Sequence, residues 1–215
     1  MTDSTALLRR LQRPVAIALL GSALAVNLSG CVGLVVGGAV AGTMAASDRR
    51  TFGAQTEDKS IAVKADVRIR NVVGDAGHVN VNSFNRKALV TGEVRDEAMK
   101  AAVEREVKAI EGVQSVVNEL EVAGPASYTS RSNDTLITTK VKASLVDAKD
   151  ISANSFKVVT ERGIVYLMGR VTQHEANKAT DIARGVPGVA KVVRVFEYIS
   201  EDEYKQYAPN PAPKN

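Results

Sequence analysis

The sequence predicts an α+β protein with two small domains, and three observations lead to this prediction. Residues 88–94 and 165–171 share one pattern, in which apolar residues alternate along a strand that contains a glycine. Each strand is followed by a helical stretch and a Gly-Val pair, which lead into a β-branched strand. The offset between matching residues stays at about 76–78, which identifies an internal repeat.

Each copy is expected to run helix, strand, strand, helix, strand. In the first copy we expect helices over residues 58–72 and 95–110, and strands over residues 78–84, 88–94 and 115–122. In the second copy we expect helices over residues 134–148 and 172–185, and strands over residues 155–160, 165–171 and 191–199. Residues 85–87 and 161–163 have the polar character of hairpin turns. Each domain therefore has a mixed three-stranded sheet packed by two helices.

The N-terminal residues 1–30 have the features of a lipoprotein signal peptide. Three arginines precede the apolar run 15–28, which is short for a membrane span. The run ends at Leu28-Ser29-Gly30-Cys31, where small residues precede the only cysteine of the chain. We expect Cys31 to be acylated and to attach the protein to a membrane. An uncleaved span is the alternative, because residues 32–46 are also apolar, although they are rich in glycine.

These features divide the chain into five parts. Residues 1–30 are expected to be the signal peptide and residues 31–56 a lipidated tether. The two repeat domains cover residues 57–123 and 132–199. The proline-containing tail 200–215 is expected to be disordered.

The charge distribution distinguishes the two domains. The formal net charge of +4 falls to +2 without residues 1–30, which is too balanced for a general nucleic-acid binder. Residues 57–124 carry 10 basic and 12 acidic side chains, whereas residues 125–199 carry 11 basic and 7 acidic side chains. An anionic partner is therefore expected to meet the second domain.

The first helix of the second domain is expected to have an apolar outer face. At about 100° per residue its core arc consists of Ile137, Val141, Ser144, Leu145 and Ala148. The opposite arc and its two flanks hold Leu136, Thr139, Lys140, Lys142, Ala143 and Val146. Apolar tips framed by lysines suit a helix that lies among lipid headgroups. Ser132, Asn133 and Asp134 each offer an oxygen that can cap the start of this helix.

The equivalent helix of the first domain is the poorer candidate for membrane contact. Its outer arc consists of Ser60, Val63, Val67 and Arg70, and Asp66 stands where the second helix has Lys142. For the second helix, a solvated face and a protein-binding face remain alternatives, because isolated apolar residues are common on protein surfaces.

The sequence offers little support for catalysis. His78 and His174 are the only histidines, and neither has a cysteine or clustered carboxylates at ligand spacing, so we expect no metal site and no cofactor. No nucleophile motif such as G-x-S-x-G is present. Residues 74–77 lack the strand-then-helix context of a phosphate-binding loop. The sequence therefore predicts a protein that is not an enzyme.

The repeated unit, with its glycine-containing strand and its Gly-Val pair, resembles the BON domain (bacterial OsmY and nodulation) over residues 58–122 and 133–199. The lipobox, the Asp48-Arg49-Arg50 segment and the Ser132-Asn133-Asp134-Thr135 stretch make the chain similar to lipoproteins with two such domains. This resemblance implies an outer-membrane lipoprotein that faces the periplasm. It also implies that the second domain binds anionic phospholipid, such as phosphatidylglycerol, and supports outer-membrane integrity and envelope stress tolerance.

Two positions modify what the resemblance implies. Val32 follows Cys31 where an aspartate would favour retention in the inner membrane, so sorting to the outer membrane is implied. Leu136 stands where the similar lipoproteins have a tryptophan, and leucine lacks the interfacial preference of tryptophan. The broader family implies an alternative function, that of a periplasmic adaptor or chaperone-like protein that binds envelope proteins.

Overall fold

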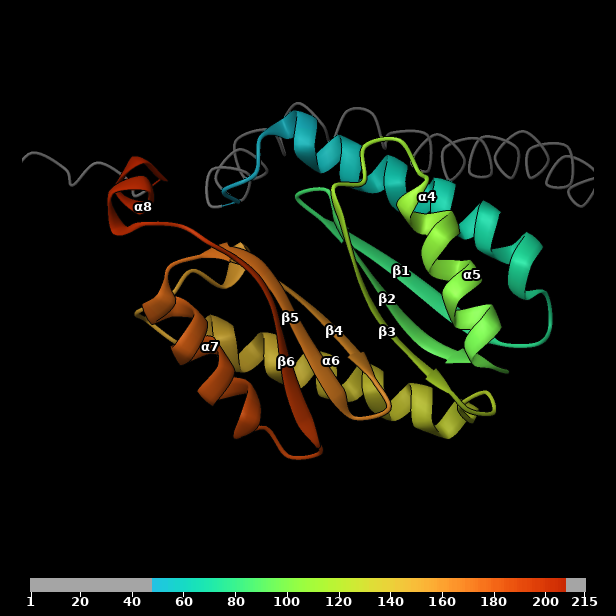
Figure 1. The fold of residues 1–215 in the computed structure, drawn as a ribbon. Helices are drawn as coiled ribbons and strands as arrows, with labels where there is room; N and C mark the ends of the chain where they lie inside the picture. The colour runs from blue at the N-terminus through green and yellow to red at the C-terminus, as the bar shows by residue number, and fades with distance from the viewer. Residues whose placement is uncertain (1–47, 208–215) are drawn as a thin grey trace, which may run out of the picture. The chain divides into compact units, whose positions relative to one another are not determined.

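The structure, a computed structural model, describes residues 48–207, which form two α+β domains (Figure 1). The first domain contains α4 (Phe52–Val73), β1 (His78–Phe84), β2 (Lys87–Val94), α5 (Glu97–Lys108) and β3 (Ser115–Val122). The second contains α6 (Tyr128–Asp147), the 3-10 helix η2 (Ala153–Ser155), β4 (Phe156–Glu161), β5 (Ile164–Val171), α7 (Gln173–Arg184) and β6 (Lys191–Tyr198). The predicted fold class is confirmed. The predicted signal peptide and Cys31 lie outside the described residues.

Each domain has a mixed three-stranded sheet with the same topology. The strand orders are β1-β2-β3 and β4-β5-β6, in which the first pair is antiparallel and the second pair is parallel. In Figure 1, α4 and α5 cover one face of the first sheet, and α6 and α7 cover one face of the second. None of the helices within residues 48–207 is both long enough and apolar enough to span a membrane.

The glycine of each central strand permits close approach of the neighbouring backbone. A Cβ atom on Gly92 would lie 2.0 Å from the carbonyl oxygen of His78, and one on Gly169 would lie 2.5 Å from that of Ser155. Gly92 also has a φ of +115°, a backbone conformation that residues with a side chain rarely adopt. The repeated glycine is thus a requirement of strand packing in both domains.

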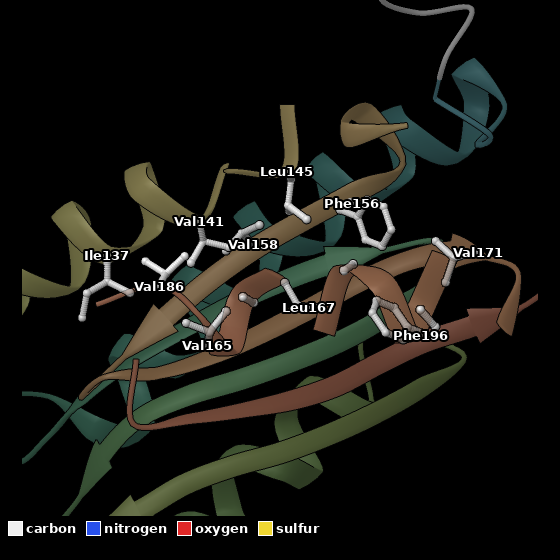
Figure 2. Close-up of a cluster of buried hydrophobic side chains, with 13 residues drawn as sticks. Ile137, Val141, Leu145, Phe156, Val158, Val165, Leu167, Val171, Val186 and Phe196 are labelled. Carbon is white, nitrogen blue, oxygen red and sulfur yellow. The ribbon is translucent and has the colours of Figure 1, made fainter. Parts of the chain in front are cut away.

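The helices bury one apolar stripe each against their own sheet. In the second domain Ile137, Val141 and Leu145 point from α6 toward Val158, Val165 and Leu167 of the sheet (Figure 2). In the first domain Ile61, Ala65 and Ile69 of α4 make the matching contacts. The core stripe predicted for α6 is confirmed at Ile137, Val141 and Leu145, whereas Ser144 and Ala148 are half-buried.

The other faces of the two sheets also contribute to a shared apolar cluster. Both domains belong to one compact unit, and this cluster joins Phe84 and Leu89 of the first domain to Tyr166, Met168 and Val195 of the second. The central strands β2 and β5 are therefore buried almost throughout, rather than on alternate residues as the sequence analysis expected.

Both first helices begin earlier than the sequence predicts. The N-caps are Thr51 for α4 and Ser127 for α6, each accepting a hydrogen bond from a backbone N–H three residues on. The prediction that Ser132, Asn133 or Asp134 caps the second helix is wrong, because Asp134 is buried within α6. The predicted disorder from residue 200 is also wrong for α8 (Glu201–Tyr207), whose Glu203 pairs with Arg170.

Consecutive arginines connect the start of the described chain to both domains. Arg49 is buried and forms a two-pronged ion pair with Glu175 of α7, with N···O distances of 2.7 and 2.6 Å. Arg50 instead pairs with Asp58 of α4 at 2.8 Å and lies 4.1 Å from the ring centroid of Phe84. A segment of two residues thus joins the tether to each domain separately.

Candidate functional site

Three hydrogen bonds to β4 and to the β4–β5 turn fix the rotation of α6 about its axis. The carboxylate of Asp134 accepts hydrogen bonds from the backbone N–H groups of Arg162 and Gly163 in the β4–β5 turn, at 2.9 and 2.8 Å. One helical turn further on, the hydroxyl of Thr138 donates to the hydroxyl of Thr160 at 2.7 Å. Since these bonds hold one side of α6 against the sheet, the opposite side is held toward solvent.

The side of α6 that faces solvent carries all six residues predicted to contact lipid. Leu136 is 58% exposed and Val146 is 68% exposed, and the remaining four are exposed as well: Thr139, Lys140, Lys142 and Ala143. We call these six residues the α6 surface. Their contact with lipid stays a prediction, but the exposure that such contact requires is present.

The lysines of the α6 surface have no acidic partners in the part of the chain that the structure describes. Among residues 48–207 neither Lys140 nor Lys142 takes part in a salt bridge. Their positive charge is therefore not neutralised locally. An ammonium group in this state gains more from an anionic headgroup than one that must first leave a carboxylate.

A second cluster of ionisable side chains lies between the domains. His78 of β1, Glu93 of β2 and Glu161 of β4 bring one ligand atom each to within 4.8 Å of one another. Glu93 is fully buried, and neither of its carboxylate oxygens has a hydrogen-bond partner. The guanidinium of Arg162 lies 3.5 Å from one of these oxygens and supplies a compensating charge.

The surroundings of this cluster shift two pKa values in opposite directions. Burial and the charge of Arg131 lower the pKa of His78, although Glu93 opposes them. Burial raises the pKa of Glu161, and Glu93 and Asp134 raise it further against the effect of a hydrogen bond from Asn80. A neutral imidazole and two carboxylates are the ligand types that could hold a divalent transition metal.

This cluster cannot be predicted from local sequence patterns, because its three members are not close along the chain. His78 and Glu93 meet as cross-strand neighbours of β1 and β2, and Glu161 comes from the other domain. A strand register would reveal the first contact, but only the packing of the two domains reveals the second. The other histidine, His174, is exposed on α7.

Comparison with known proteins identifies the class of this fold. The model of the BON domain matches residues 62–124 and 133–200, which together make up more than half of the chain. The chain therefore belongs to the BON-domain family, as a member with two copies of the domain.

Three named proteins are similar to the chain over more than half of its length. The chain is 37% identical to the outer membrane lipoprotein DolP of Haemophilus influenzae, over 80% of this chain and 90% of that protein. It is 28% identical to a 21 kDa hemolysin of Actinobacillus pleuropneumoniae, over 71% of this chain and 79% of that protein. It is also 31% identical to the osmotically inducible protein Y of Escherichia coli, over 53% and 58% of the two chains. The similarity to DolP, which covers most of both chains, groups this chain with the outer-membrane lipoproteins.

Proposed function

We propose that this protein is a non-enzymatic lipoprotein of the outer membrane that faces the periplasm and binds anionic phospholipid through the α6 surface. Acyl chains on Cys31 confine it to the bilayer, which raises the effective concentration of headgroups around α6. Weak contacts are then sufficient to select regions of the bilayer that are rich in phosphatidylglycerol-like lipid. Through this selection the protein supports outer-membrane integrity and tolerance of envelope stress.

One observation carries the proposal: exposed apolar side chains and unpaired lysines occupy the same side of one helix. Leu136 and Val146 provide apolar area for the boundary between headgroups and acyl chains. Lys140 and Lys142 provide charge for lipid phosphates, at about 1 kcal/mol for each basic residue near an anionic surface. The similarity to DolP, an outer membrane lipoprotein, supports the location.

The experiment removes the apolar contact without touching the core. We use the chain from residue 31 onward with Cys31→Ser, so that acyl chains cannot cause binding, and measure flotation with vesicles. Leu136→Glu should lower binding to phosphatidylglycerol-containing vesicles about tenfold, because it removes apolar area and adds a repelled charge. Vesicles of phosphatidylcholine alone should bind the parent weakly.

Val67→Glu is the matched control, because Val67 is 59% exposed on the equivalent helix α4, close to the 58% of Leu136. It should leave vesicle binding nearly unchanged, and both variants should unfold at the temperature of the parent. A Leu136→Glu protein that floats as well as the parent would rule out the α6 surface as the lipid contact. In that case, loss of binding to an envelope protein in the same variant would favour the adaptor function instead.

A further inference from the structure

A basic hollow adjoins the α6 surface. It has a volume of about 360 Å³ and lies between α4, the end of β1, α6 and the start of β4, within the usual size range of small-ligand sites. Four basic side chains contribute to its lining: Arg50, Lys59, Lys142 and Lys157. Lys142 also belongs to the α6 surface, so it connects the hollow to the face that is proposed to meet the membrane.

The positive charge of this hollow exceeds the negative charge that the protein supplies. Arg50 already has acidic partners, since its guanidinium pairs with Asp48 at 2.7 Å and with Asp58 at 2.8 Å. In contrast, Lys59, Lys142 and Lys157 form no salt bridge with any residue in the described part of the chain. Three ammonium groups around one opening are therefore beyond salt-bridge distance of the carboxylates of residues 48–207, including Asp58, which also lines the hollow.

Lys157 is the most enclosed of these three lysines. Its side chain is half-buried, and within residues 48–207 its ammonium donates to the backbone carbonyl of Ser83 alone, at 3.3 Å. Burial lowers the pKa of Lys157, and the charges of Arg50 and Lys142 lower it further against the opposing effect of Asp58. Like charges thus act on one another in this hollow, and an anion placed among them would relieve that repulsion.

We propose that this hollow binds the phosphate group of an anionic phospholipid, with Lys59, Lys142 and Lys157 as its contacts. Phosphate oxygens accept short, charge-assisted hydrogen bonds from ammonium groups, and each non-bridging oxygen of a phosphodiester can accept from more than one of them. The proposal rests on the proposed function, because it takes the phosphate from a membrane lipid. A soluble phosphate ester has the same chemistry, so the test treats the two sources separately.

The first arm measures binding to phosphatidylglycerol-containing vesicles, with the same chain from residue 31 onward carrying Cys31→Ser. Lys59→Gln and Lys157→Met should each lower the apparent affinity about fivefold, the size expected for one lysine at an anionic surface. Lys191→Gln removes the same charge from an exposed residue outside the hollow and should change the affinity by less than about twofold. Lys59 is exposed, so Lys59→Gln tests the hollow even where Lys157→Met alters stability.

The second arm titrates the parent with glycerol 3-phosphate and records backbone amide shifts by NMR. Shifts should concentrate at the lining residues Ser83, Phe156 and Lys157, and should vanish in Lys157→Met. Unchanged vesicle affinity in both lysine variants, together with no shifts at these amides, would overturn the hollow while leaving Leu136→Glu free to support the α6 surface. If glycerol 3-phosphate shifts these amides but the parent does not bind the vesicles, the hollow is a phosphate site, and both the lipid source and the proposed function are overturned.

Discussion

The outer faces of α4 and α6 differ in how their basic residues are paired rather than in how apolar they are. Val63 and Val67 of α4 are 66% and 59% exposed, close to the 58% and 68% of Leu136 and Val146 on α6. On α4, however, three of the four basic residues face an acid: Lys64 with Glu111 at 3.7 Å, Arg68 with Glu106 at 3.9 Å, and Arg70 with Asp66. The fourth, Lys59, lies at the basic hollow. Charge pairing, more than exposed apolar area, therefore distinguishes the two outer faces.

Beneath these faces the two helices are held by the same device. Asp58 of α4 and Asp134 of α6 each accept two backbone N–H groups of the following hairpin turn. Asp58 accepts two further hydrogen bonds, from the hydroxyl of Ser83 at 2.6 Å and the guanidinium of Arg50 at 2.8 Å. The two domains thus share these internal contacts and differ at their outer helix surfaces.

The largest expected effect tests whether this device is equally important in both domains. Asp58→Ala should lower the free energy of unfolding by about 4 kcal/mol and Asp134→Ala by about 2 kcal/mol, because each change leaves buried donors without an acceptor. The difference is expected because the first turn places two non-glycine residues at positive φ, Asn85 at 49° and Arg86 at 65°, whereas the second turn has Gly163 at one such position.

Urea unfolding followed by circular dichroism measures both losses. Asp66→Ala is the control, since Asp66 lies on α4 but is exposed, and it should change stability by less than about 0.5 kcal/mol. An Asp134→Ala loss that equals or exceeds the Asp58→Ala loss would contradict the ranking of the two turns.

The same aspartates show why the starts of the first helices were predicted too late. An aspartate that precedes an apolar helical pattern is a common N-cap signal, and Asp58 and Asp134 both have this appearance. Their actual partners are backbone groups 27 to 29 residues further along the chain. A local sequence pattern cannot distinguish an aspartate that caps a helix from one that binds a distant turn. The strands β1 and β3 have the predicted bounds, because alternation and turn residues alone define them.

Contacts between the two domains are even harder to predict from the sequence than the starts of the helices. The outward arc of α6 follows from helical periodicity, so all six of its residues could be predicted. The ion pair of Arg49 with Glu175 joins residues 126 positions apart. Lys157 lies in the basic hollow, but nothing in the sequence of β4 distinguishes it from any other lysine of a strand. Burial on both faces of β2 and β5 depends on the packing of one sheet against the other, which no single repeat unit encodes.

An intermediate effect is expected from exchanging the charge pattern of the two outer faces. Lys142→Asp should lower the affinity of the chain for phosphatidylglycerol-containing vesicles roughly tenfold or more, because two units of charge change at the α6 surface. Asp66→Lys makes the reverse change on α4 and also frees Arg70 from its partner, so it should raise the affinity several-fold. Vesicle flotation at low and at physiological salt measures both changes.

Salt provides the control for this exchange. Added salt should reduce the differences between the variants and the parent, because the interactions involve exposed charges. If Asp66→Lys gains no affinity while Lys142→Asp loses it, then pairing alone does not account for the difference between the helices, and the basic hollow beside Lys142 becomes the better explanation.

The smallest effect concerns a position where the two hairpins differ. Phe84 closes the first hairpin opposite Lys87, and Glu161 closes the second opposite Ile164. Glu161 is buried, and its neighbours include Glu93 and Asp134 on the acidic side, with Arg131 and a hydrogen bond from Asn80 in opposition. The pKa of Glu161 is raised, first by burial and then by the two carboxylates. An apolar position in one domain is thus a titrating position in the other.

Glu161→Gln should make stability less sensitive to pH. The folded chain keeps the Glu161 proton at pH values where the unfolded chain has released it, so the free energy of unfolding falls as the pH rises from the ordinary glutamate value of 4.5 toward the raised pKa. Glutamine carries no such proton and can still accept the hydrogen bond from Asn80. Urea unfolding between pH 4.5 and 8 should therefore favour the variant increasingly with pH. Glu201→Gln, at an exposed position, should give a curve parallel to that of the parent, and a parallel curve for Glu161→Gln would show that burial of this carboxylate does not oppose folding.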